Sequence, residues 1–159
     1  MPVSITIDAK QALGRMTALP EQVRNNLRRV LPQLGKDLGA AVEKNLDRLK
    51  SHNRLKVSKK MVENPRTIYV TVSLDWTGEA SKKLVPLFLE EGTRPHVIEA
   101  RNAPVLAFFW EKKGEWFFGP KVNHPGNKAY KIVFDAYELQ KVHIRAEMER
   151  AVRSAGAVR

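Results

Sequence analysis

Five side chains in the middle of the chain are of the kinds that bind metal ions or move protons: Glu90, Glu91, His96, Glu99 and His124. Imidazoles and carboxylates suit divalent cations and general acid–base catalysis. Their spacing supports neither role, because the sequence has no helical histidine pair around a glutamate, no phosphate-cradling glycine loop and no nucleophile elbow. Cysteine is absent altogether. We therefore predict a protein that is not an enzyme, has no metal, cofactor or small-molecule substrate, and bonds His96 and His124 to nearby backbone.

The length and composition predict a single folded domain over residues 1–159. Of the 159 residues, 43% are hydrophobic, which is enough for a core in one domain of this size. The N-terminus lacks the cationic start and apolar run of a signal peptide, and no segment has the roughly 20 apolar residues that a membrane span needs. We expect a protein that stays in the cytosol and away from membranes.

The formal net charge of +11, from 28 Lys+Arg against 17 Asp+Glu, is unevenly distributed. Residues 1–66 hold 14 of the basic residues but only 6 of the acidic ones. The densest stretch, 48–66, is poor in apolar residues, which predicts an exposed, mobile basic loop. Its seven cations face only Glu63 and are candidates for contact with DNA or a partner protein: Arg48, Lys50, Arg54, Lys56, Lys59, Lys60 and Arg66.

Helical spacing dominates both ends of the chain. Apolar residues three and four apart predict a helix over 21–49, with Pro20 suited to its first turn and Pro32 expected to kink it or divide it in two. The same spacing over 128–153 predicts one or two helices, followed by a frayed tail at 154–159. Before the first long helix we expect a short strand containing Ile5 and Ile7, then a small helix capped by Asp8 and containing Leu13 and Met16.

Between the helices the apolar pattern changes to a period of two. Ile68, Val70, Val72 and Leu74 predict a half-buried antiparallel strand, and the run 84–89 is ambiguous in type. Further strands are expected at 96–100, 105–110 and 115–122, the last two joined by a hairpin turn at 111–114. Because helix, strands and helix are segregated along the chain, we predict an α+β fold: one antiparallel sheet packed against a long N-terminal and a C-terminal helix.

Three short motifs follow one another in the strand region: VPLFLEEGTRPHVI at 85–98, VLAF at 105–108 and KVNHPG at 121–126. Together they resemble the tailed-phage neck family, the head–tail joining or tail completion proteins. The resemblance directly covers 85–126, whereas 76–83 and 48–66 match nothing in that family. The motif residues that we carry over are Glu91, Gly92, Thr93, His96, His124, Pro125 and Gly126.

The resemblance implies a virion structural protein whose copies form a homo-oligomeric ring in the neck. Its partners would be other neck, portal or tail proteins, with packaged DNA as a further contact, and it would be found in the host cytoplasm during assembly. The residues themselves predict tight turns at sheet ends. Gly92 and Gly126 suit positive φ angles, Pro125 stiffens its turn, and the Thr93 hydroxyl can bond local backbone.

A basic nucleic-acid-binding protein is the alternative function. Lysine and arginine neutralise phosphates, and aromatic side chains offer stacking surfaces for bases. The candidates for stacking are Tyr69, Trp76, Trp110, Trp116 and Phe117. Against this alternative, strands that alternate with a period of two can bury one face, so we expect Phe108, Trp110, Trp116 and Phe118 to lie mostly in the core.

Overall fold

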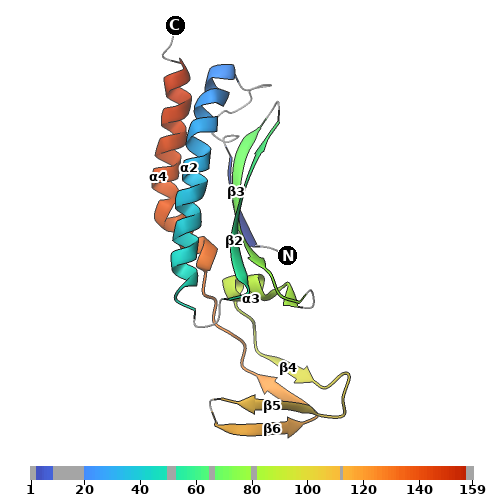
Figure 1. Ribbon diagram of the computed structural model, residues 1–159. Helices are drawn as coiled ribbons and strands as arrows, with labels where there is room; N and C mark the ends of the chain where they lie inside the picture. The colour runs from blue at the N-terminus through green and yellow to red at the C-terminus, as the bar shows by residue number, and fades with distance from the viewer. Residues whose placement is uncertain are drawn as a thin grey trace.

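The computed structural model describes residues 3–8, 20–49, 53–64, 67–79, 82–111 and 113–156. They form an elongated body from which a narrow arm, residues 96–124, projects at one end (Figure 1). In chain order the elements are β1 (Val3–Asp8), α2 (Glu21–Leu46), β2 (Leu55–Glu63), β3 (Ile68–Trp76), α3 (Val85–Glu91), β4 (His96–Glu99), β5 (Leu106–Trp110), β6 (Glu115–Gly119), β7 (Lys121–His124) and α4 (Ile132–Gly156). The predicted α+β fold with two long helices is confirmed.

The body has two layers, a helix pair and a three-stranded sheet (Figure 1). The sheet is antiparallel in the order β1-β3-β2, and Val72 at its centre lies between Ile5 and Lys59. Because side chains alternate across a strand, the apolar residues of β3 face the helices, while its serine and threonine residues face outward. The strands predicted around Ile5 and Val72 are thereby confirmed.

A row of leucines on α2 forms the centre of the core. Val72 and Leu74 of the sheet are fully buried in the same cluster as Ile132 and Val133 of α4. At Gly35 an added Cβ would lie 2.6 Å from Val70 Cγ2, so α2 approaches the sheet closely there. The leucines of α2 in this row are Leu27, Leu31, Leu34, Leu38 and Leu46.

The long helix α2 runs through Pro32 without ending. Because Pro32 has no N–H, the backbone carbonyl one turn earlier loses its helical hydrogen bond. Pro32 is exposed, so that carbonyl lies on the solvent side of the helix and can be hydrated. The predicted division into two helices is wrong, and Pro20 is the N-cap residue instead of lying in the first turn. At the other end of the chain, α4 continues to Gly156 with Ala155 buried, so the tail predicted at 154–159 is wrong for 154–156.

The basic loop predicted over 48–66 is wrong for 55–63, which form strand β2. All nine residues pair with β3, and this pairing between distant segments outweighs the low apolar content. Lys56 and Lys60 lie on the outer face, whereas Lys59 lies on the helix side with its Nζ 3.9 Å from a Glu43 oxygen. Strand β2 lies at the edge of the sheet. Lysines on an edge strand are a common feature that discourages it from pairing with a strand of another chain.

The predicted single sheet is also wrong. The arm consists of two separate two-stranded ladders, β4–β7 and β5–β6. Pro120 separates β6 from β7, which divides the strand predicted over 115–122. The segment predicted as ambiguous at 84–89 is helical, as α3. The small helix predicted after Asp8 lies outside the described residues.

One ion-pair cluster fixes the end of β2 to α2. Both carboxylate oxygens of Glu63 accept hydrogen bonds from Arg28, with the shortest at 2.7 Å, and Arg24 donates to Glu63 at 3.1 Å. The hydrogen bond from Arg28 is the main cause that lowers the pKa of Glu63, and the bond from Arg24 adds to it. The pKa of Arg28 is raised by the same contact.

We expect Glu63→Gln to remove a pH-dependent part of the stability. A carboxyl whose pKa is lower in the folded chain stabilises the fold above its ordinary value, 4.5, and this contribution is lost as the pH falls through the lowered pKa. The difference in free energy of unfolding between wild type and variant should therefore be full near neutral pH and shrink below 4.5. Chemical denaturation at a series of pH values measures it. A difference that stays constant down to strong acid would contradict this assignment.

Candidate functional site: the arm and its joint

The motif residues meet where the arm leaves the body. The two chain segments of the arm are joined there by a bridge between Thr93 and Asn127. Each residue donates its backbone N–H to the carbonyl of the other, at 2.9 and 3.1 Å, and the Asn127 N–H lies 2.9 Å from the Thr93 hydroxyl. The Thr93 hydroxyl bonds backbone, as predicted, but its partner is 34 residues away along the chain, so the prediction of a local bond is wrong. We call this bridge and its flanking glycines the joint.

Two glycines let the segments of the joint approach closely. Gly92 and Gly126 have φ angles of 73° and 84°, as predicted, in a region that favours glycine. A Cβ on Gly92 would lie 2.5 Å from the Asn127 oxygen, and one on Gly126 would lie 2.2 Å from the Thr93 oxygen. Each glycine therefore lies so close to the backbone of the opposite segment that any other residue would force one of the two segments to move.

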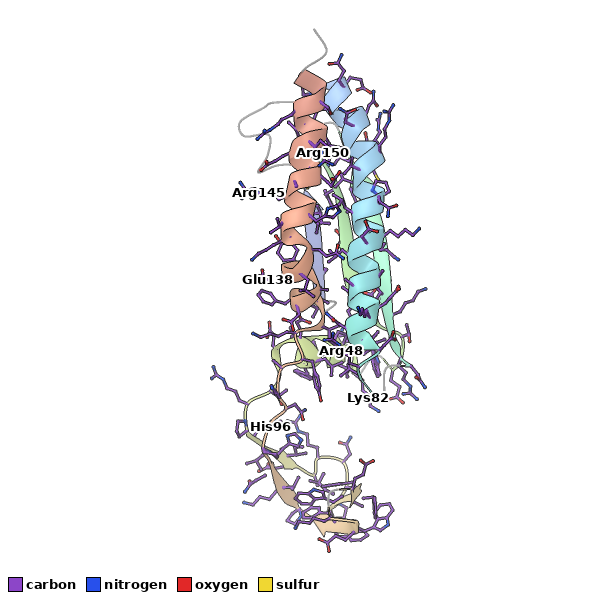
Figure 2. All side chains as sticks on the ribbon, turned by 90° about the vertical axis from the view of Figure 1, so that its left-hand side faces the viewer. Arg48, Lys82, His96, Glu138, Arg145 and Arg150 are labelled. Atoms are coloured by element: carbon purple, nitrogen blue, oxygen red, sulfur yellow. The ribbon has the colours of Figure 1, made fainter. Side chains whose placement is uncertain are left out.

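The two histidines lie side by side next to the joint. His96 and His124 are paired in the β4–β7 ladder, and their ring centroids are 5.0 Å apart. His96 Nδ1 donates to the Arg94 carbonyl at 2.8 Å, and His124 Nδ1 accepts from the Gly126 N–H at 3.0 Å. The predicted backbone bonds are confirmed, and Figure 2 shows His96 at the start of the arm.

Glu90 has a structural role that its sequence context did not reveal. Its two carboxylate oxygens accept hydrogen bonds from the backbone N–H groups of Val133 and Phe134 at 3.0 and 2.7 Å. These are free donors of the first turn of α4, where a negative charge is favoured. Glu90 therefore fixes the end of α3 to the start of α4, while its neighbour Glu91 is exposed.

The residues weighed for metal binding or catalysis do not gather into one site. Glu90 is engaged by α4, and Glu99 is exposed at the far end of β4 from His96. Within the described ranges, no group of three or more His, Asp or Glu side chains could hold a metal ion.

The β5–β6 hairpin is apolar on both faces. One face carries Phe109, Trp116 and Phe118, with exposed fractions of 49%, 62% and 66%. Their rings contact in sequence, since the centroids of Trp116 lie 6.0 Å from Phe109 and 6.2 Å from Phe118. The opposite face has its own ring cluster, formed by Phe108, Trp110 and Phe117.

The prediction that these aromatic residues belong to the core is wrong. The strands alternate as expected, but among the described elements no helix or further sheet covers either face of the hairpin (Figure 1). Phe108 is more than one-third exposed, and Trp116 and Phe118 are among the most exposed large apolar residues described. An uncovered two-stranded hairpin is marginally stable in water, so this surface is a candidate for contact with another molecule.

The cations proposed for DNA or partner contact are divided among different surfaces. The three lysines of β2 lie on both faces of that strand, as described above. Arg48 and Arg54 are exposed before it, and Figure 2 shows Arg48 at the arm-facing end of α2. Lys50 and Arg66 lie outside the described residues.

No family model matches the chain, and neither a curated protein nor a solved structure is similar enough to be matched. In the part of the chain that the structure describes, none of the helices is long and apolar enough to cross a membrane.

Proposed function

We propose that this chain is a structural subunit of a tailed-phage neck, a head–tail joining or tail completion protein whose copies form a ring near the portal and tail. One observation carries the proposal: the arm is aromatic on both faces and has no core of its own. Strands with both faces apolar are typical of sheets covered on both sides. None of the helices and strands that the structure describes covers the hairpin, so we expect another molecule to supply that cover.

The amount of apolar surface makes assembly the natural role. Full burial of a large apolar side chain contributes about 1.5–3 kcal/mol. Trp116 and Phe118 forgo more than half of that in the isolated chain, because each is more than 60% exposed. An arm with this surface stabilises a complex more than it stabilises the subunit.

The joint supports the proposal that this chain is a neck protein, because it is built from the residues on which the resemblance rests. The neck-family resemblance rests largely on the residues around Gly92 and Gly126, which hold the two segments of the arm together. A motif that builds the base of a projecting arm fits a subunit that reaches a neighbour. Ring closure requires a heterologous contact, in which one surface meets a different surface on the next copy.

Nucleic-acid binding is favoured less by the same structure. The lysines of β2 are divided between the two faces of this edge strand, so they do not form one positive surface. Lys59 also forms an ion pair with Glu43. The most exposed aromatic residues are in the arm, whose hairpin carries both Lys113 and the carboxylates Glu111 and Glu115. A phosphate-binding groove combines stacking side chains with a continuous positive surface.

The test is assembly with the products of the neighbouring genes. Light scattering after size-exclusion chromatography should detect a ring of this chain, alone or with its portal or tail partner, and the chain should be present in purified particles. A protein that stays monomeric with those partners and is absent from particles would contradict the proposal. Binding to duplex DNA at low salt, lost steeply as salt rises, would instead favour the alternative.

A further inference from the structure

We infer that His124 makes the joint of the arm sensitive to pH, because its hydrogen bond from the Gly126 N–H exists only while the imidazole is neutral. Near neutral pH this bond holds the turn that brings Gly126 against Thr93. In acid the bond is lost, the joint loosens and the arm is freed to move. This property belongs to the joint itself and does not depend on the proposed ring.

The hydrogen bonds at the joint fix which nitrogen of each neutral imidazole carries the hydrogen. His124 Nδ1 lies 3.0 Å from the Gly126 nitrogen, which is a donor, so Nδ1 holds a lone pair and the hydrogen is on Nε2. His96 has the opposite form, since its Nδ1 donates to the Arg94 carbonyl at 2.8 Å. Protonation therefore leaves the bond of His96 in place but removes the acceptor of His124.

The turn at His124 is one that asparagine or aspartate often makes. In an Asx turn the side-chain oxygen accepts a hydrogen bond from the backbone N–H two residues further on. His124 Nδ1 accepts from Gly126 in the same way, across Pro125. An asparagine oxygen is an acceptor at every pH, whereas a protonated imidazole has two N–H groups and no acceptor. The histidine therefore gives this turn a dependence on pH that asparagine would not.

The bond lies at the tightest part of the joint. A Cβ on Gly126 would lie 2.2 Å from the Thr93 oxygen, and the next residue, Asn127, makes the bridge to Thr93. When His124 is protonated, the Gly126 N–H faces another N–H, and a donor left without an acceptor destabilises the structure that holds it there. The turn relieves this contact by moving Gly126 away from His124, which pulls on the bridge.

The charges around His124 favour the same response. Strand β7 packs against β4, where His96 lies directly opposite with its ring centroid 5.0 Å away, so two protonated rings would repel each other. Among the described residues no carboxylate forms an ion pair with either imidazole. The other charged groups of this ladder and of the segments that lead to the joint are Glu91, Arg94, Glu99, Lys121 and Lys128.

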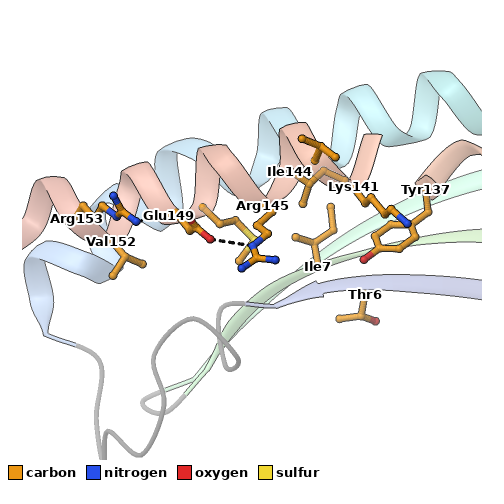
Figure 3. Close-up of a pocket in the computed structure, with 11 residues that line it drawn as sticks. Thr6, Ile7, Tyr137, Lys141, Ile144, Arg145, Glu149, Val152 and Arg153 are labelled. Carbon is orange, nitrogen blue, oxygen red and sulfur yellow. Dashed lines mark hydrogen bonds and ion pairs between the residues drawn. The ribbon is translucent and has the colours of Figure 1, made fainter. Parts of the chain in front are cut away.

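The pH range separates this effect from the ion pairs of the body. A histidine side chain changes its charge between about pH 5 and 8. On α4 the pKa of Glu149 is lowered mainly by its hydrogen bond from Arg145, at 2.9 Å (Figure 3). The pKa of Glu63 is also lowered, as described above. Both carboxylates stay ionised through the histidine range, so the joint can loosen while these ion pairs persist.

Hydrogen exchange at the joint tests the inference. Nuclear magnetic resonance gives the protection factor, the ratio of the intrinsic to the observed exchange rate, for the backbone N–H groups of Thr93, Gly126 and Asn127. We expect the protection factors of the wild type to fall about tenfold between about pH 7.5 and 5.5, the range in which histidine gains its proton. A factor of this size corresponds to the loss of one hydrogen bond.

Two asparagine variants identify the residue responsible. His124→Asn keeps an acceptor for the Gly126 N–H and gains no proton, so its protection factors should be the same at both pH values. His96→Asn is the matched control, because it keeps a donor for the Arg94 carbonyl. Its protection factors should fall as those of the wild type do.

Two results of the exchange measurement would overturn the inference: equal protection at both pH values in the wild type, or a fall in His124→Asn as large as in the wild type. A third measurement needs no variant. The nitrogen chemical shifts of wild-type His124 near neutral pH report which ring nitrogen carries the hydrogen. We expect it on Nε2, and a hydrogen on Nδ1 would also overturn the inference.

Discussion

Replacing Trp116 and Phe118 together by serine should abolish ring assembly and leave a folded monomer. Both side chains are more than 60% exposed, so the isolated subunit loses little when they are removed. In the assembled state each contributes part of the 1.5–3 kcal/mol of a buried large side chain. A loss of about 2–4 kcal/mol from the pair weakens each contact by roughly 30- to 700-fold.

Light scattering measures the oligomeric state of this double variant, and circular dichroism measures its melting temperature. We expect a monomer at concentrations where the wild type forms rings, with a melting temperature within about 2 °C of wild type. Leu139→Ser is the matched control, since Leu139 is 79% exposed but lies on α4 and not on the hairpin. Normal rings from the double variant would refute the role of the hairpin face.

Gly126→Ala should release the arm from its joint at a large cost in stability. The new Cβ would lie 2.2 Å from the Thr93 carbonyl oxygen, which is backbone and cannot turn aside, and the residue would keep a φ of 84°. Strain in this region costs about 1–3 kcal/mol, and the steric clash adds to it. We expect more than about 3 kcal/mol in total, and more again for Gly126→Val, which is branched at Cβ.

Gly114→Ala separates the cost of backbone strain from the cost of the steric clash. Gly114 has a φ of 69°, similar to that of Gly126, but an added Cβ there meets nothing within 4 Å. Its cost should be that of the backbone angle alone, about 1 kcal/mol. Chemical denaturation gives both costs, and limited trypsin digestion reports how readily the arm is cut. Equal effects of the two alanine variants would show that close approach at the joint contributes nothing.

Local chemistry allowed part of this structure to be predicted from the sequence. The leucine spacing of α2 and the alternation of β3 each reflect one buried face, and both elements are where the pattern placed them. The positive φ angles of Gly92 and Gly126 follow from the tight turns around them. The hydrogen bonds of the histidines are likewise to residues within two positions along the chain.

Contacts between distant segments explain what could not be predicted. Strand β2 is held by pairing with β3, and its lysines hide the alternation that would have marked it. Glu90 accepts from Val133, which is 43 residues away, so no neighbouring residue signals its role. The apolar pattern of the hairpin correctly indicated strands suited to burial, but a pattern cannot specify whether the covering surface belongs to the same chain.

The joint also determines how a mechanical load would pass through the subunit. A pull on the arm stretches both of its segments at once, and the Thr93–Asn127 hydrogen bonds tie those segments together where they enter the body. Glu90 then connects the end of α3 to the first turn of α4. Tension on the tip is therefore passed to the long helix α4, which packs against α2, instead of peeling α3 away alone.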